Sequence, residues 1–288
     1  MLIFIKNILF IFDYTIAMQN YQKVVLITGA SSGMGRATVL YLAKKGFIVY
    51  AGSRTPQKLF DIQSENIRPV KLDITDPESI EEALCYIEKI DVLINNAGYG
   101  LVSTVEDVRE EEMFEQFNVN VFGIMRMCKA VIPKMRHQHH GVIINISSFL
   151  GKIGLPLLTF YNASKYAVEG ITDSLRYELR DFNIRVHSIL PGFFDTNFAK
   201  ENLVTNKQTF EDNSPYEALV SSLAPTIVEQ INSGNDTEEV AHMILDMIEN
   251  PDSSARQTAG DKAKKFIPMK KELSDEDFER RVRAYYNL

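Results

Sequence analysis

Short apolar runs alternate with longer amphipathic segments along most of the chain. Six runs have the composition of buried strands, and turns or segments with helical spacing separate them. The expected strands are residues 24–28, 47–52, 69–74, 91–98, 141–148 and 184–192. Continuous apolar strands that alternate with helices are typical of a parallel sheet covered on both faces. The pattern therefore predicts an α/β fold, a doubly wound parallel sheet flanked by helices.

Helices are expected between these strands. Residues 36–45 have apolar positions on adjacent turns and end at Gly46, while Asp76 and Pro77 form an N-cap and a first helical position. Two longer helical segments, 110–136 and 161–180, precede the last two strands.

The remainder of the chain suggests a single domain with additions. Residues 21–260 are expected to form this domain, which includes a mobile lid with short helices over the polar, weakly periodic residues 193–235. Residues 261–288 form a charged tail, helical in part, and residues 1–20 form an apolar N-terminal extension.

The extension is apolar but does not have the pattern of a membrane span. Lys6, Asn7 and Asp13 interrupt it, and no uncharged run approaches the about 20 residues that cross a bilayer. It also fits a signal peptide poorly. Because the residues from Met18 make an ordinary opening for the domain, the favoured interpretation of residues 1–17 is a start-site artefact or a dispensable extension. A membrane-associating anchor is the alternative.

Composition and charge narrow the possible functions. The chain has 288 residues and a net charge of −7, so it lacks the basic excess that nucleic-acid binding requires. Two cysteines are too few for a disulfide framework and suit a reducing cytoplasm. His137, His139 and His140 are expected to form a solvated helix end, so we expect no bound metal.

A glycine-rich turn follows the first strand and opens the first helix. Glycines at this point let the backbone approach a pyrophosphate, whose charge interacts favourably with the helix N-terminus. The placement predicts a Rossmann fold that binds a dinucleotide. The turn contains Gly29, Ser31, Ser32, Gly33, Met34 and Gly35.

The end of the second strand indicates which dinucleotide is bound. An acidic residue here would bind the ribose 2′-hydroxyl of NAD, but residues 47–57 contain none. Ser53 and Arg54 instead provide a hydroxyl and a guanidinium, which suit a 2′-phosphate. We therefore expect NADP(H), with NAD(H) as the less favoured cofactor.

Tyr161 and Lys165 are four residues apart on an expected helix and so project from one face. A cation one turn away would lower the pKa of the tyrosine, as a general acid/base requires. Ser148 ends the fifth strand at the edge where such sheets bind ligands, and could donate to a carbonyl oxygen. Ser147 is the competing candidate, although strand alternation favours Ser148.

The order of these motifs resembles the short-chain dehydrogenase/reductase family, in its compact single-domain branch. The resemblance spans about residues 22 to 250, and the segment 256–258 is loosely similar to steroid and retinol oxidoreductases. It rests on the glycine turn and on Asp73, Asn95, Asn96, Ala97, Gly98, Asn120, Ser148, Tyr161, Lys165, Pro191 and Gly192.

The resemblance implies a role for each matching residue. Tyr161 would be the acid/base, Lys165 would also bind the nicotinamide ribose, and Ser148 would orient the substrate oxygen. Asn120 would hold a water behind Lys165, and one of Asn95 and Asn96 could serve the sheet alone. The cofactor would also contact Asp73, Ile74, Asn96, Ala97, Gly98, Pro191, Gly192, Phe194 and Thr196.

These expectations describe an NADP(H)-dependent oxidoreductase acting on a small carbonyl or alcohol. Phe193, Phe194, Phe198 and Phe210 could line an apolar substrate pocket or simply pack within the lid. The family resemblance implies a homodimer or homotetramer. An epimerase or lyase with the same cofactor, and a non-catalytic NADP-binding regulator, are the alternative functions.

Overall fold

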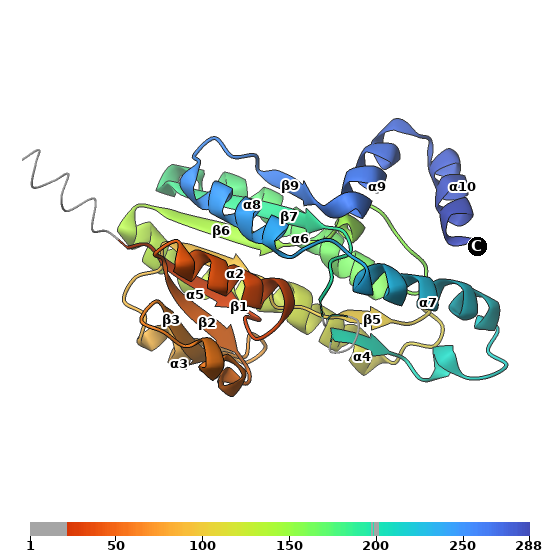
Figure 1. Ribbon diagram of the computed structural model, residues 1–288, viewed down its shortest axis with the longest axis horizontal. Coiled ribbons are helices and arrows are strands. Elements are labelled where there is room, and N and C mark those ends of the chain that lie inside the picture. The colour runs from red at the N-terminus through yellow and green to blue at the C-terminus, as the bar shows by residue number, and fades with distance from the viewer. Residues whose placement is uncertain (1–21, 197, 199–201) are drawn as a thin grey trace, which may run out of the picture.

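The computed structural model describes residues 22–196, 198 and 202–288, and a seven-stranded parallel sheet forms its centre (Figure 1). The strand order is β3-β2-β1-β4-β6-β7-β9, and every neighbouring pair is parallel. The doubly wound parallel sheet predicted from the sequence is confirmed. Its strands are β1 (Val24–Thr28), β2 (Ile48–Ser53), β3 (Ile67–Lys71), β4 (Val92–Asn95), β6 (Gly141–Ile146), β7 (Ile184–Pro191) and β9 (Arg256–Ala259).

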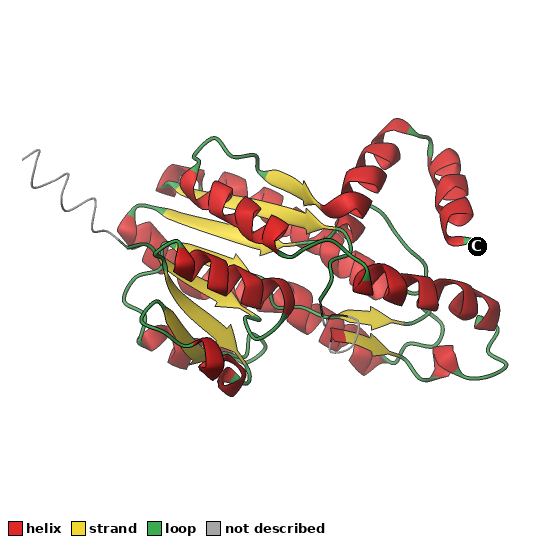
Figure 2. Ribbon diagram, in the orientation of Figure 1, coloured by secondary structure: helices red, strands yellow, loops and turns green. Residues whose placement is uncertain are grey.

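Helices cover both faces of this sheet, as Figure 2 shows. On one face Val25 and Ile27 of β1 pack in a core with α2 (Gly33–Lys44) and α8 (Glu238–Glu249). On the other face Val24 and Leu26 pack in a second core. That core includes residues of α3 (Pro77–Cys85), α5 (Gly123–Gln138) and α6 (Thr159–Glu178). Neighbouring residues of β1 therefore serve opposite layers, as strand geometry requires.

The order of the strands creates a ligand-binding edge. The chain runs outward from β1 through β2 to β3, and then returns to place β4 on the other side of β1. The chain after β1 leads to α2 on one face and the chain after β4 leads on to α5 on the other, and ligands bind at such a switch point in open α/β sheets.

The predicted helix over 110–136 consists of three elements. α4 (Glu110–Phe117) and α5 are joined by a π-helical turn, η2 (Asn118–Phe122), which contains the buried Asn120. π-helical turns inside helices occur frequently at functional sites. The apolar pattern predicted the helix but not this turn, which widens the backbone where Asn120 faces the interior.

The segment predicted as a lid includes a longer helix than expected. α7 (Glu217–Asn232) has 16 residues, and β8 (Leu203–Thr205) pairs with β5 (Gly100–Val102) in a small second sheet. Asp107 Oδ2 accepts hydrogen bonds from Thr104 Oγ1 at 2.6 Å and Thr209 Oγ1 at 2.9 Å, all three residues being buried. This part of the predicted lid is thus fastened to the loop that follows β5.

The C-terminal residues form a helical hairpin, α9 (Gly260–Glu272) and α10 (Asp275–Tyr286). Its helical content was predicted, but its charge did not indicate how much of it is buried. Phe266, Phe278 and Tyr286 enter a third core with α7. Short 3-10 turns complete the chain: η1 (Pro56–Ile62), η3 (Phe149–Gly151), η4 (Arg180–Phe182) and η6 (Gln208–Phe210).

The predicted N-terminal extension, including the alternative of a membrane anchor, lies outside the described residues. Among the helices described, none combines the length and hydrophobicity needed to cross a bilayer. The histidine segment ends α5, where His139 is a left-handed C-cap and His140 Nε2 lies 2.7 Å from Asp91 Oδ1.

Candidate active site

The loops after β1 and β4 are held tightly together. Asn96 Nδ2 donates to the carbonyls of Thr28 and Gly29, each at 3.0 Å. Gly29 has a φ of +66°, and a Cβ there would lie 2.7 Å from Ala97 Cα. A Cβ on Gly35 would lie 2.5 Å from Asn96 Nδ2. Side chains are therefore excluded at both glycines, and the backbone at the start of α2 stays open to a ligand.

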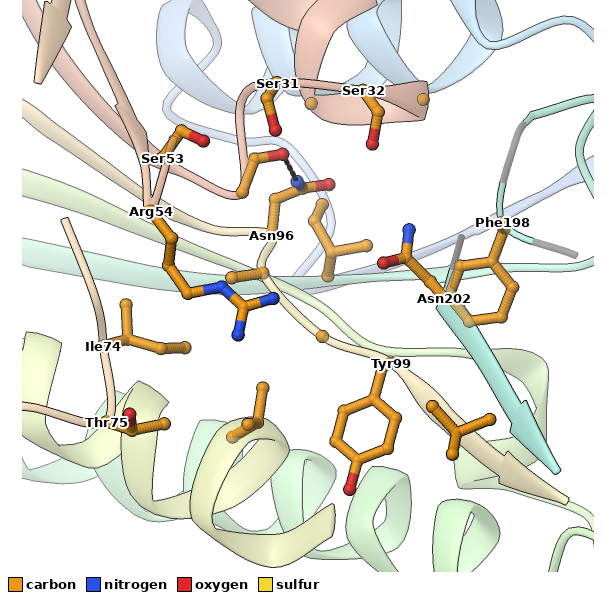
Figure 3. Close-up of a pocket in the computed structure, with 18 of the residues that line it drawn as sticks. Ser31, Ser32, Ser53, Arg54, Ile74, Thr75, Asn96, Tyr99, Phe198 and Asn202 are labelled. Carbon is orange, nitrogen blue, oxygen red and sulfur yellow. Dashed lines mark hydrogen bonds between the residues drawn. The ribbon is translucent and has the colours of Figure 1, made fainter. Parts of the chain in front are cut away.

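A cleft of about 940 Å³ follows the carboxyl edge of the sheet past this turn (Figure 3). Most of the residues predicted to bind the cofactor line it. These are Gly29, Ser31, Ser32, Gly33, Met34, Gly35, Ser53, Arg54, Asp73, Ile74, Asn96, Ala97, Gly98, Tyr161, Lys165 and Thr196.

Cationic side chains lie at one end of the cleft. Arg54 extends from the end of β2 into the open space, as Figure 3 shows. Ser53 is buried, and its Oγ accepts a hydrogen bond from Thr55 N at 3.1 Å. Lys58, in η1, also lines the cleft and was not predicted, although a second cation four residues after Arg54 was visible in the sequence.

Asp73 occupies the next part of the wall. Its Oδ1 accepts from Thr75 N at 2.9 Å and from Thr75 Oγ1 at 2.7 Å, so the carboxylate closes a turn. Ile74 and Thr75 then present their side chains to the cleft (Figure 3). This apolar wall, together with Val119 of η2, suits a flat ring such as an adenine.

Of the predicted catalytic residues, Tyr161 and Lys165 line the other end of the cleft, whereas Ser148 borders a smaller adjoining cavity. Ser148 follows β6 and caps η3, its Oγ accepting from Leu150 N at 3.1 Å. Burial raises the pKa of Tyr161 to about 12, and the hydrogen bond with Ser148 acts in the opposite direction. Of the two serines considered, Ser148 is therefore the one that interacts with Tyr161. Ser147 also lines the cleft, and its buried Oγ has no hydrogen-bond partner among the described residues.

The expected lowering of the Tyr161 pKa by Lys165 was wrong for this structure. Lys165 Nζ donates to the Ile146 carbonyl at 2.9 Å and lies 5.6 Å from the centre of the Tyr161 ring. Loss of solvent around the phenol outweighs any effect of this cation. Burial also acts on Lys165 itself and lowers its pKa to about 8, while Glu169 raises it.

The side chains of Asn95 and Asn120 form hydrogen bonds with other protein groups. Asn95 Nδ2 donates to Asn145 Oδ1 at 2.9 Å inside the sheet, so Asn95 is the asparagine that serves the sheet. Asn120 Nδ2 donates to Tyr99 O at 2.9 Å and to Ser164 Oγ at 3.1 Å. Asn120 does not line the cleft, but a Cβ on Gly98 would lie 3.1 Å from its Oδ1 and 3.8 Å from Lys165 Nζ.

A second, smaller cavity of about 80 Å³ opens beside Tyr161 and Ser148. Pro191, Gly192 and Phe194, predicted to contact the cofactor, line this cavity instead of the main cleft. Ile227 and Ile231 of α7 form part of its wall. Five residues border both spaces: Met34, Ser147, Tyr161, Thr196 and Phe198.

The aromatic residues of the predicted lid divide into two groups. Phe193, Phe194 and Phe198 line the small cavity, which favours the substrate-pocket interpretation for them. Phe210 lies on η6 and is 38% exposed, away from both cavities.

Several further residues at the mouth of the cleft were not predicted. Tyr99 follows the glycine that ends the β4 loop, and burial together with Glu115 and Glu112 raises its pKa to about 12. Asn202 also lines the cleft, as do Tyr99 and Phe198 (Figure 3). The short β5 and β8 strands that carry this wall have no strong apolar pattern of their own.

Comparisons with known proteins agree with this geometry. Residues 23–207 match the family model described as short chain dehydrogenase. The chain is 42% identical over 208 residues to a 3-ketodihydrosphingosine reductase of Bacteroides thetaiotaomicron, covering 70% of this chain and 74% of the relative. It is 33% identical over 265 residues to a 3-amino-tetrahydro-pyrrolizinone reductase of Xenorhabdus hominickii, covering 88% of this chain and 92% of the relative.

Solved structures give the same result. A short-chain dehydrogenase from Streptomyces avermitilis superposes with a TM-score of 0.78 at 30% identity, covering 93% of this chain and 97% of that one. Another from Burkholderia cenocepacia, in complex with NADP, has a TM-score of 0.70 at 26% identity and covers 92% and 97%. The family match, the similar relatives and the parallel sheet establish that this chain belongs to the short-chain dehydrogenase/reductase family of oxidoreductases.

Proposed function

We propose that the protein transfers a hydride between NADP(H) and a carbonyl or alcohol group, with Tyr161 as the general acid/base. The observation that carries the proposal is that Tyr161 borders both the large cleft and the small apolar cavity. A side chain at this junction can reach a cofactor on one side and a substrate on the other.

The cleft fits a dinucleotide. The open backbone at Gly29 and Gly35, at the N-terminus of α2, suits a pyrophosphate. Arg54 and Lys58 put two cations where a 2′-phosphate would lie, which favours NADP(H) over NAD(H). Solved relatives support the cofactor class, since one is in complex with NADP and a reductase from Brucella melitensis is complexed with NADH.

The proposed chemistry divides among three side chains. When bound, NADPH supplies the hydride that adds to the carbonyl carbon. Tyr161 gives its proton to the carbonyl oxygen, and Ser148 donates a hydrogen bond to the same oxygen. Lys165 stabilises the phenolate left on Tyr161 until a solvent proton replaces the one transferred. Oxidation of an alcohol is the reverse of these steps.

Asn120 completes the proposed proton path through a water. The space next to Gly98 lies between the Asn120 side chain and the Lys165 ammonium. A water there would have polar partners on both sides and could return a proton toward Tyr161 through Lys165.

The substrate we propose carries an apolar substituent next to its carbonyl. Phe193, Phe198 and Ile227 line the cavity that adjoins Tyr161, and an apolar group that enters it leaves water. The 42% identical relative is named a 3-ketodihydrosphingosine reductase, which is compatible with a ketone on an apolar molecule.

Turnover of Tyr161→Phe tests the function. Loss of the phenol proton should lower kcat for NADPH-dependent reduction of apolar ketones by about 100-fold to 10,000-fold. The Kd for NADPH should stay unchanged. Absorbance at 340 nm measures turnover, and Tyr177→Phe, which is exposed on the same helix, is the matched control. Full activity in Tyr161→Phe would disprove the mechanism, and NADPH binding by the wild type without turnover of any ketone would favour the regulator.

We also propose an oligomeric state and a cellular location for the protein. Phe122, Met125 and Tyr166 expose apolar surface on η2, α5 and α6, and a homodimer or homotetramer formed through these elements would cover it. Cys85 and Cys128 are both free thiols, which suits a cytoplasmic protein.

A further inference from the structure

A buried carboxylate lies directly behind the catalytic pair. Glu169 follows Lys165 by four residues on α6, as Lys165 follows Tyr161, so the three side chains occupy one face of the helix. Only 3% of Glu169 is exposed to solvent. A buried carboxylate is expensive unless it is paired with cations.

Two cations from distant parts of the chain meet this carboxylate. Arg256 of β9 donates from Nε to Glu169 Oε2 at 2.7 Å, and Lys152, which follows η3, lies 3.0 Å from the same oxygen. Glu169 Oε1 has no hydrogen-bond partner among the described residues. Both cations therefore meet the same oxygen, and the other oxygen is buried without a hydrogen bond in the part of the chain that the structure describes.

The η3 loop closes over this carboxylate and shields it from water. A Cβ on Gly151 would lie 2.9 Å from Lys165 O, 3.2 Å from Glu169 Cγ and 3.0 Å from Ser147 Oγ. The loop that presents Ser148 to Tyr161 is thus also the loop that covers Glu169. In such a dry environment a charge acts strongly on its neighbours.

We propose that Glu169 is a positioning residue for the reaction, holding the buried Lys165 in its cationic form. The inference rests on the function proposed for Tyr161 and Lys165 and adds a third member to their row. The charged or titratable groups that share a helix face with Lys165 are Tyr161 and Glu169, and the cations Lys152 after η3 and Arg256 on β9 pair with Glu169. Among these only Glu169 is an anion that favours the ammonium.

Glu169 favours the charged form of Lys165. Burial lowers the pKa of Lys165 to about 8, and Glu169 raises it. The ammonium is present below this pKa and is lost above it. Without the carboxylate this favourable interaction is lost, so the Lys165 pKa would fall further.

The test compares Glu169→Gln with the wild type by two measurements. NMR titration of protein with ¹³C-labelled lysine side chains follows Lys165 in the cofactor-free protein, with the signal identified by its loss in Lys165→Arg. We expect the Lys165 pKa to fall by about one pH unit. The pH profile of kcat should follow, with a loss of about five-fold at pH 8 and none at pH 6.

Two variants serve as controls. Asp173→Asn removes a carboxylate that also pairs with Arg256, at 2.5 Å, but lies one turn further from Lys165 and is 49% exposed at its side chain. It should leave the Lys165 titration unchanged. Glu169→Asp keeps the charge but withdraws it by one methylene, so it should keep most of the wild-type profile and lower the Lys165 pKa by a measurable fraction of that unit.

Coincident Lys165 titrations in the wild type and Glu169→Gln would overturn the inference. So would a loss of kcat that is equal at every pH, since a purely structural defect has that signature. If Glu169→Gln does not fold, the titration of Glu169→Asp decides, because a withdrawn carboxylate should still lower the Lys165 pKa measurably. A shifted Lys165 titration without NADPH turnover would uphold this inference and refute the proposed function.

Discussion

The glycine turn after β1 and the cavity beside α7 belong to the same site, but they are formed by different kinds of contact. At the turn, backbone geometry and one amide side chain, that of Asn96, fix the shape. At the cavity, apolar side chains from η3, the end of β7 and α7 form the wall. The turn is thus a short backbone segment held by one distant residue, whereas side chains from several distant segments form the wall of the cavity.

The wall of the cavity also depends on the end of the chain. Phe266 of α9 lies 6.4 Å from Phe149 between ring centres, and Phe149 lies 5.4 Å from the cavity residue Phe193. Tyr286 stacks on Phe266 from the other side, at 6.3 Å. Packing thus connects the C-terminal hairpin to the proposed substrate pocket, whereas the glycine turn has no such dependence. The turn and the cavity should respond differently to substitution.

Phe266→Ala should produce the largest difference between the effect on ketone binding and the effect on NADPH binding. Phe266 is 1% exposed, so its truncation should lower the free energy of unfolding by about 3–5 kcal/mol. At temperatures where the variant is folded, KM for an apolar ketone should rise while the Kd for NADPH stays near the wild-type value. Chemical denaturation and 340 nm kinetics measure the two effects, with the half-exposed Phe210→Ala as control. Equal losses of ketone and NADPH binding would show that the turn and the cavity are not separable.

Arg54→Ala tests the side of the site that is proposed to bind the cofactor. Loss of a charge-assisted contact worth about 1.5–3 kcal/mol should raise the Kd for NADPH by about 10-fold to 100-fold and leave the Kd for NADH unchanged. Fluorescence titration with each cofactor gives both constants. Arg68→Ala, which removes another guanidinium on the neighbouring β3, is the control. If the ratio of the Kd values for NADPH and NADH is unchanged, the 2′-phosphate does not bind at Arg54. Lys58 is then the next residue to test.

Ile227→Val should have the smallest effect and the most local one. Ile227 is 3% exposed and borders the cavity, so the lost methylene should cost about 0.5–1.5 kcal/mol of stability. KM should change for ketones with bulky apolar groups and not for small ones. Val228→Ala, at an exposed position on α7, should change neither. An identical response to all ketones would argue against a substrate group in this cavity.

The parts of the fold that were predicted have strong local patterns. β1 matched its predicted bounds because VVLIT is a continuous buried run between a polar residue and a glycine turn. β9 was not predicted, because Arg256, Gln257 and Thr258 carry no apolar signal and form a strand only by pairing with β7. The π-helical turn at Asn120 was missed for a related reason, since one extra residue in a helical turn barely disturbs the apolar spacing.

In the candidate site, too, local features could be predicted from the sequence and features that depend on burial could not. Tyr161 and Lys165 are neighbours through helix geometry alone, and the sequence was sufficient to pair them. The raised pKa of Tyr161 could not be predicted, because it results from burial by segments that are distant in sequence. Lys58 was visible as a cation, but its approach to the cleft depends on how η1 folds back.

The amino-acid sequence was sufficient to predict six strands of the sheet, helices between them, the glycine turn and the spacing of Tyr161 and Lys165. These features depend on backbone geometry and on residues close together in the chain. Only the tertiary structure brought Lys152, Glu169 and Arg256 into one buried cluster behind Lys165. It also enclosed the apolar cavity, because burial and the electrostatics that follow from it arise only when distant segments exclude water together.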